Sequence, residues 1–189
     1  MRMGARPKQV LPVKVFSGLI LSKSLGPDIC LPAIEKVFGK ADFKSRGLDF
    51  CRYSSYYNEE MGDGLTRYFI AFKDLADRTE LPDFKIRAQA VEKEFSVQGK
   101  RTLNLDPGYL TLGQVFLAST KDNFFRIYLR DGVYAEVTLY FKGGEYRAFP
   151  WTYPDYADRP YRDILNEIRT LYKTQLDCNQ GSESDGETA

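Results

Sequence analysis

Apolar and polar positions follow a regular order in the first half of the chain. The apolar run at 13–22 and the stretches rich in β-formers at 41–54, 65–73 and 101–106 predict four strands. Two segments between them carry apolar residues at helical spacing, one with Cys30, Ala33, Ile34, Val37 and Phe38, the other with Phe84, Ala88, Val91 and Phe95. The order β-α-β-β-α-β is that of the ferredoxin-like fold.

The second half is richer in strands. "FFRIYL", "VYAEVTLYF" and "EYRAF" predict a three-strand antiparallel meander. A three-residue loop at 130–132 pairs Ile127 with Ala135, keeps the apolar side chains on one face and sets Arg126 opposite Glu136. A two-residue turn at 143–144 pairs Leu139 with Ala148.

A C-terminal amphipathic helix is predicted by apolar residues spaced from Tyr161 to Tyr172, with Asp158 as its cap. The expected fold class is α+β: a ferredoxin-like core, then the meander, then this helix. Residues 12–177 form one domain in this interpretation, after a flexible lead-in at 1–11. The polar, acidic stretch at 178–189 is predicted to be a disordered tail.

Composition narrows the classes of function. The chain has 189 residues and a net charge of +1, which gives no bulk attraction to nucleic acid or anionic lipid. It has no histidine, so Ser-His-Asp and Cys-His catalysis are excluded within it and no zinc site is expected. Three widely spaced cysteines, no secretory signal and no apolar span predict a cytoplasmic protein without membrane contact.

The stretch "NLDPGYLTLGQVFLASTKDN" at 104–123 is the strongest candidate for a site. Asn104 and Asp106 share one face at the end of a predicted strand, with Tyr109 beside them. A purely structural interpretation is equally open, in which Asp106 caps the next element, Pro107 starts it and Gly108 turns the chain.

Three other clusters have both a functional and a structural interpretation. Thr120 and Lys121 can hold a phosphate or belong to a solvated loop. The face with Tyr128, Arg126 and Glu136 can stack bases or be covered by a helix, with Arg126 and Glu136 as a cross-strand pair. The acidic loop with Glu59, Glu60 and Asp63 can hold Mg²⁺ or be a surface loop.

Several nucleotide-binding motifs are missing from the sequence. Neither G-x-x-x-x-G-K-[ST] nor the G-x-G-x-x-G signature of NAD and FAD sites occurs. "TKDN" at 120–123 differs from the guanine-reading T-K-x-D, because its Asp stands one place early.

"KRTLNLDPGYLTLGQVFLASTKDN", "RIYLRDGVYAEVTL" and "PWTYPDY" together resemble a bacterial family catalogued as domain of unknown function number four-four-one-six. The resemblance covers about residues 12–173 and implies a small, single-domain cytoplasmic protein. Members sometimes carry a GTP-binding label, which the motifs above do not support. The resemblance carries over no catalytic residues.

The three blocks are expected to meet in space as one polar cluster with aromatic walls, formed by Asn104, Asp106, Tyr109, Thr120, Lys121, Arg126, Glu136, Trp151 and Asp155. The leading hypothesis is a binding module for a phosphate-bearing small ligand such as a nucleotide or a nucleic-acid end, with Arg126 and Lys121 on the phosphate. One alternative is a hydrolase or transferase that uses Asp106 and Glu136, with or without Mg²⁺. Another is a protein–protein adaptor with no pocket.

Overall fold

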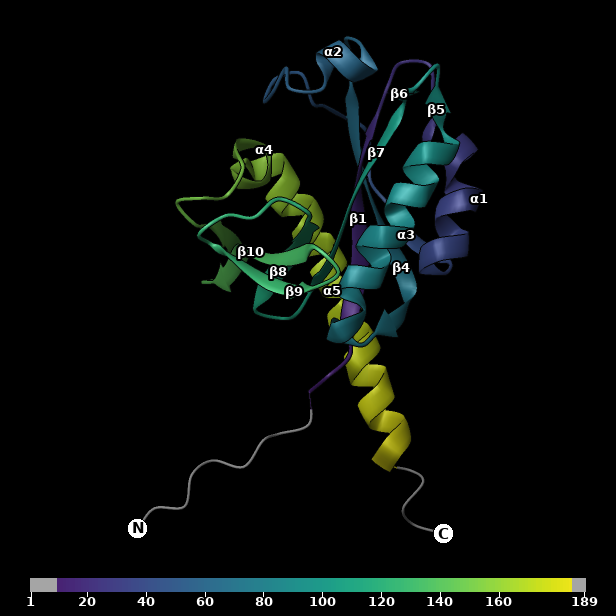
Figure 1. Ribbon diagram of the computed structural model, residues 1–189. Helices are drawn as coiled ribbons and strands as arrows, with labels where there is room; N and C mark the ends of the chain where they lie inside the picture. Colours follow the sequence, from purple (N-terminus) through teal and green to yellow (C-terminus); the bar gives the residue numbers. More distant parts are fainter. Residues whose placement is uncertain (1–9, 185–189) are drawn as a thin grey trace.

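The computed structural model describes the chain from residue 10 to residue 184, with side chains to residue 179 (Figure 1). Its first half contains β1 (Val13–Leu21), α1 (Pro27–Phe38), β2 (Ala41–Lys44), β3 (Leu48–Asp49), α2 (Asn58–Met61), β4 (Thr66–Ala76), the short 3₁₀ turn η1 (Arg78–Glu80) and α3 (Leu81–Glu94). Its second half contains β5 (Ser96–Val97), β6 (Lys100–Arg101), β7 (Leu103–Leu110), β8 (Gln114–Ser119), β9 (Arg126–Arg130), β10 (Val133–Lys142), β11 (Glu145–Ala148), α4 (Pro154–Ala157) and α5 (Arg159–Ser184).

A nine-stranded antiparallel sheet organises the molecule. Its order is β11-β10-β8-β7-β1-β4-β2, with β3 beside β4 and β9 beside β10. This confirms an α+β fold with a large antiparallel sheet and a C-terminal helix. The four strands of the expected core are neighbours in the order β7-β1-β4-β2, but β8, β10 and β11 extend the same sheet beyond β7. The ferredoxin-like assignment therefore stays a prediction for this larger sheet.

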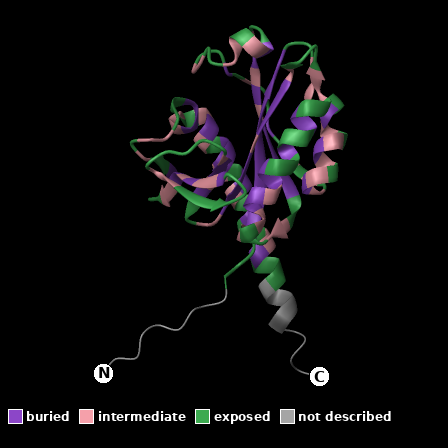
Figure 2. Cartoon of the chain, viewed as in Figure 1, coloured by how far each residue is buried: buried purple, intermediate pink, exposed green. Residues whose placement is uncertain are grey.

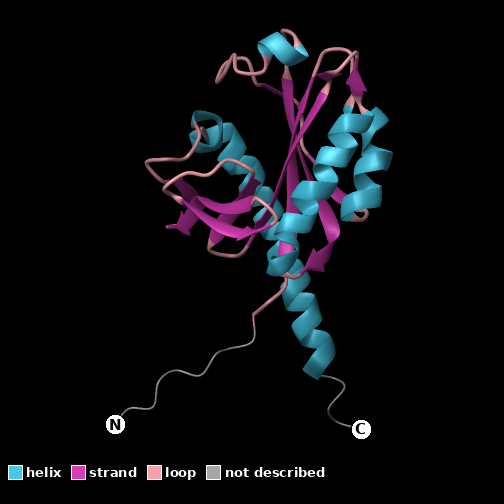
Figure 3. Cartoon of the chain, in the orientation of Figure 1, coloured by secondary structure: helices cyan, strands magenta, loops and turns pink. Residues whose placement is uncertain are grey.

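Helices cover both faces of the central strands, as Figure 3 shows. Val15 and Leu19 of β1 pack in a core cluster with residues of α1 and α3, whereas Phe16 packs in a second cluster with residues of α5. All residues of β1 are consequently buried, and the strands at the centre of Figure 2 are coloured accordingly. A strand covered on both faces is expected to be a continuous apolar run, as "VFSGLIL" nearly is.

The structural interpretation with a turn at Gly108 is wrong, and so is the expected end of the strand at residue 106, because β7 continues through Pro107 and Gly108 to Leu110. Pro107 lies opposite Ser17 of β1. Gly108 is needed for close approach rather than for a turn, because a Cβ there would overlap the carbonyl oxygen of Phe116 on β8. The apolar run that follows is itself a strand, β8, which the sequence interpretation did not identify.

The meander has the predicted register but a different first turn. Ile127 lies opposite Ala135 and Arg126 opposite Glu136, as expected. The connection is a two-residue turn in which Asp131 and Gly132 both have positive φ, and a bulge next to Val133 restores the register. The predicted pairing across the 143–144 turn is confirmed.

Some boundaries differ from the expected ones. The strand predicted at 41–54 is broken into β2 and β3, and α3 stops at Glu94 before the small β5–β6 hairpin. The predicted tail at 178–189 overlaps α5, which remains helical to Ser184. Residues 185–189 of that tail and residues 1–9 of the lead-in lie outside the described residues. Within 10–184, the helices include none that combines the length and the apolar character needed to cross a bilayer.

Candidate functional site

The site lies where β7 and β8 separate. The two strands pair only between Gly108–Leu110 and Val115–Leu117, so the earlier part of β7 has no strand on this side. Two side chains of α3 replace it: Lys85 Nζ donates to the carbonyl oxygen of Leu105 (3.0 Å), and the Leu105 N–H donates to Glu92 Oε1 (2.6 Å). The backbone N–H and C=O groups of Leu105, which have no neighbouring strand, are thus paired with a glutamate and a lysine side chain.

A cavity of about 600 Å³ occupies the space between the separated strands. Its walls come from β7, the end of β8 with the following loop, α3, the segment between β3 and α2, and α4. The charged and amide side chains in its lining are Arg67, Lys85, Gln89, Glu92, Arg101, Asn104, Asp106, Lys121, Arg126, Glu136 and Asp155, and the aromatic ones are Phe50, Tyr53, Tyr56, Tyr57, Tyr153 and Tyr156. The volume is that of a typical small-molecule site.

Arg67 of β4 is the central charge of the cavity. Its Nη1 donates to Asp106 (2.9 Å) and its Nη2 to Asp155 (3.2 Å), and its side chain is only 3% exposed. Burial opposes the charge of Asp106, but Arg67 and Lys85 outweigh it and hold the pKa of Asp106 below its ordinary value. Burial raises the pKa of Asp155, against the opposing effect of Arg67.

Sequence reasoning missed Arg67. The available signal was its position in "LTRYFIAF", where an arginine interrupts an otherwise apolar central strand. Such a charge is rarely buried without paired carboxylates, which here come from β7 and α4.

A second arginine, Arg101, fixes the position of Asn104. Its Nε and Nη2 donate to the two carboxylate oxygens of Glu60 (2.7 Å each), and its Nη1 donates to Asn104 Oδ1 (2.9 Å). The hydrogen bonds from Arg101 lower the pKa of Glu60. Glu60 of the predicted acidic loop is therefore paired with an arginine.

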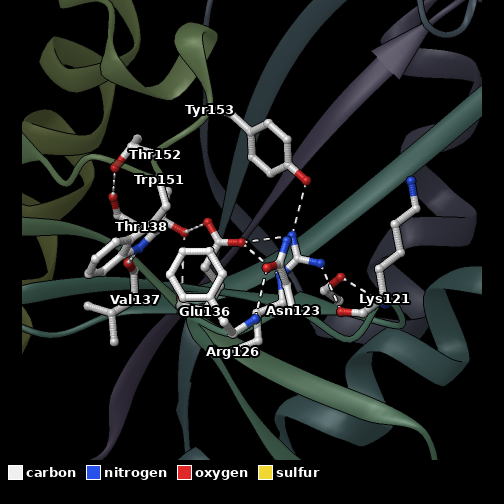
Figure 4. A network of polar contacts seen from close by, with 11 residues as sticks. Lys121, Asn123, Arg126, Glu136, Val137, Thr138, Trp151, Thr152 and Tyr153 are labelled. Atoms are coloured by element: carbon white, nitrogen blue, oxygen red, sulfur yellow. Dashed lines mark hydrogen bonds and ion pairs between the residues drawn. The ribbon is translucent and has the colours of Figure 1, made fainter.

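Arg126 and Glu136 form the buried pair shown in Figure 4. Arg126 Nε and Nη2 both donate to Glu136 Oε2 (2.9 Å each), Nη2 also donates to the Tyr153 hydroxyl (3.0 Å), and Nη1 donates to the carbonyl oxygen of Lys121 (2.8 Å). Burial raises the pKa of Glu136, although Arg126 opposes the shift. All three side-chain nitrogens of Arg126 already have hydrogen-bond partners. The residue therefore positions Glu136, Tyr153 and the loop at Lys121.

Tyr109 and Trp151 are not among the residues that line the cavity. Tyr109 stacks on Phe116 at 4.7 Å in a separate apolar cluster. Trp151 stacks on Phe125 and Phe149, and its Nε1–H donates to the carbonyl oxygen of Val137 (3.0 Å). The other seven residues of the expected cluster do line it: Asn104, Asp106, Thr120, Lys121, Arg126, Glu136 and Asp155.

Lys121 meets Tyr56 at the cavity. Lys121 Nζ donates to the Tyr56 hydroxyl (3.2 Å) and lies 4.7 Å from the centre of its ring. Tyr53 belongs to the same segment between β3 and α2 as Tyr56, and its hydroxyl donates to Oδ2 of Asp158, the residue before α5 (2.6 Å). The segment between β3 and α2 thus contacts both the β8–β9 loop and the start of α5.

Several hydrogen-bond donors of the lining have no protein partner. Arg67 Nε, Asn104 Nδ2 and the Tyr156 hydroxyl are buried and make no hydrogen bond of good geometry, although the Asn104 amide is close enough to help lower the pKa of Asp106. Lys85 is 9% exposed, makes one hydrogen bond and, within the described part of the chain, no ion pair. Buried donors without partners are uncommon in native proteins, so these groups stand out among the residues of the lining.

The carboxylates do not gather into a metal site. Among residues 10–179, no group of three or more Cys, Asp or Glu side chains is arranged to hold a metal ion. Asp106 and Glu136 line the same cavity, but each is held by its own arginine.

The fold and cavity define an α+β protein with a polar cavity beside its sheet. The chain belongs to the family described as Domain of unknown function (DUF4416), which matches residues 11–172. No curated protein and no solved structure matches it significantly.

Proposed function

We propose that the protein is a binding module for a phosphate-bearing small ligand such as a nucleotide or a nucleic-acid end. The observation that carries the proposal is the set of unused donors in the cavity lining: Lys85 Nζ, Arg67 Nε, Asn104 Nδ2 and the Tyr156 hydroxyl. A ligand rich in acceptor oxygens satisfies them: a phosphate supplies such oxygens to Lys85, and the rest of the ligand supplies them to the other three donors.

Lys85 and Lys121 are the residues that fit the phosphate best. Lys85 uses one of its three N–H donors on Leu105, which leaves two for a ligand. The Lys121 ammonium group donates to the Tyr56 hydroxyl and lies over its ring, and it makes no ion pair with the described residues. Arg126, in contrast, has its three nitrogens engaged, so it supports the site through Glu136 and the loop.

A hydrolase or transferase is the second candidate, because Asp106 and Glu136 line one cavity. Burial raises the pKa of Glu136, while Arg67 and Lys85 hold that of Asp106 low, so the two carboxylates differ as an acid and a base do. Both carboxylates accept hydrogen bonds from arginine, which favours binding over catalysis.

A thermal-shift titration tests the proposal. The probes are inorganic phosphate, AMP, GTP, ATP and a short RNA, each with and without Mg²⁺. A ligand that binds only the folded state raises Tm by mass action. At a ligand concentration of one hundred times Kd, the free energy of unfolding increases by about 2.7 kcal/mol. We expect a saturable shift that Lys85→Met abolishes and Lys121→Ala reduces.

The matched control is Lys93→Met, which removes an exposed lysine of the same helix. Circular dichroism without ligand shows whether Lys85→Met is folded, and Lys121→Ala provides a second test because its side chain lies on the surface. No shift with any probe, or equal shifts in wild type and both variants, would contradict the proposal.

A further inference from the structure

The deepest wall of the cavity combines donors and acceptors. Arg67, Asn104 and Tyr156, which we call the floor, are each at least 97% buried and each keep a polar atom without a hydrogen-bond partner. Asp106 stands beside them with its side chain 25% exposed, and it accepts one hydrogen bond from Arg67. An ionised carboxylate has room for about four hydrogen bonds, so Asp106 retains acceptor capacity.

The charges around the floor disfavour the binding of a phosphate there. One guanidinium, that of Arg67, faces two carboxylates, those of Asp106 and Asp155. The low pKa of Asp106 keeps that carboxylate ionised at neutral pH. A phosphate placed here would meet a like charge at close range, whereas Lys85 makes no ion pair in the described residues and offers its own positive charge, although that charge also acts on Asp106 and Glu92.

An uncharged group that both donates and accepts suits these neighbours. A hydroxyl group carries one donor and two acceptor lone pairs. It can donate to Asp106 while it accepts from Asn104 Nδ2 or Arg67 Nε, and a second hydroxyl can pair with that of Tyr156.

We infer that the ligand is a phosphorylated sugar, with the phosphate at Lys85 and neighbouring hydroxyl groups on the floor. This inference rests on the proposed function, since it assumes a phosphate at Lys85. It adds the chemical class of the rest of the ligand, which the floor selects by hydrogen bonding to hydroxyl groups. The cavity of about 600 Å³ accommodates a ligand of this size.

The test compares two esters of the same charge by isothermal titration calorimetry. Ribose 5-phosphate carries hydroxyl groups, and ethyl phosphate carries none. We expect ribose 5-phosphate to bind about tenfold more tightly, because a tenfold difference is about 1.4 kcal/mol, which two hydrogen bonds of ordinary strength supply.

Tyr156→Phe locates the hydroxyl contact. It deletes an oxygen that has no protein partner, so the fold keeps every described hydrogen bond. We expect ribose 5-phosphate to bind about three- to tenfold more weakly and ethyl phosphate to bind as before. Tyr128→Phe is the control, because it removes the hydroxyl of an exposed tyrosine that does not line the cavity.

A second variant, Asn104→Asp, keeps an oxygen for Arg101 and removes the amide donor. It should also weaken ribose 5-phosphate more than ethyl phosphate. Equal affinities of the two esters in the wild type, or a Tyr156→Phe variant that binds ribose 5-phosphate like the wild type, would overturn the inference and leave the proposed function standing. Failure of both esters, phosphate and the nucleotides to bind would overturn both.

Discussion

Gly18 lies directly beneath the guanidinium of Arg67. A Cβ built on Gly18 would stand 2.6 Å from Arg67 Nη1 and 2.9 Å from the Tyr156 hydroxyl. Gly18 of β1 pairs with Asp106 of β7 and with Phe69 of β4, so the arginine reaches from β4 over β1 to its carboxylate on β7. The missing side chain at position 18 is what makes this ion pair geometrically available.

Gly18→Ala should therefore damage both stability and the site. The added methyl group displaces Arg67 or Tyr156, and overpacking of this kind costs about 1–3 kcal/mol. Urea denaturation measures the loss. Gly26→Ala is the control, because its nearest neighbour would be the Ile29 side chain at 4.0 Å, and its stability should change by less than about 1 kcal/mol. Equal effects of the two variants would contradict the role assigned to Gly18.

Arg67→Met should destabilise the protein strongly near pH 7.5. It leaves Asp106 and Asp155 buried without their cation, and breaking a buried pair costs about 3–5 kcal/mol. Without Arg67, burial raises the pKa of Asp155 further above its unfolded value, whereas at Asp106 Lys85 and Asn104 still oppose the effect of burial. The folded variant then binds more protons than the unfolded one, so its deficit against wild type should shrink as the pH falls from 7.5 to 5.

The pH dependence of this stability deficit is tested by the urea midpoints of wild type and Arg67→Met at pH 7.5 and pH 5. A further substitution, Asp155→Asn, removes one of the stranded charges and should restore part of the lost stability at pH 7.5. A deficit that is the same at both pH values would show that lost packing, rather than the stranded carboxylates, explains the destabilisation.

Glu136 should make the wild type less stable as the pH rises above the ordinary glutamate value of 4.5. Its folded-state pKa is raised by burial, so between 4.5 and that raised value the folded chain holds a proton that the unfolded chain has lost. Stability falls through that window and is level above it. Glu136→Gln cannot titrate and should lack this component, so a difference in stability between variant and wild type that is constant with pH would contradict the raised pKa.

Trp151→Phe should reduce stability modestly and leave ligand binding intact. Phenylalanine retains stacking on Phe125 and Phe149 but loses the hydrogen bond to the Val137 carbonyl, which costs about 1 kcal/mol. Thermal unfolding measures the change, and the phosphate titration measures binding. A variant that has normal stability but no longer binds phosphate would show that Trp151 contacts the ligand.

The register of the meander could be read from the sequence because side chains alternate between faces. Pairing Ile127 with Ala135 was the arrangement that kept apolar residues together, and the protein has that arrangement. The length of the turn could not be predicted from the sequence, because a two-residue turn with a bulge next to Val133 gives the same register as the expected three-residue loop. Local patterns similarly predicted α1 and the start of α5, whose apolar faces have helical spacing.

The sequence by itself determined the α+β class and indicated seven of the residues that line the cavity. It did so because strand alternation and helical spacing are local properties of neighbouring residues. Only the tertiary structure decided where β7 and β8 separate, since "DPGYL" is compatible with a turn or a strand until Gly108 is seen against Phe116. The same holds for Arg67 and Lys85, whose burial and partners depend on elements far away in the chain. Strand β7 brings Asp106 to Arg67 and Leu105 to Lys85, and helix α4 brings Asp155 to Arg67, so no local pattern around either residue predicts its surroundings.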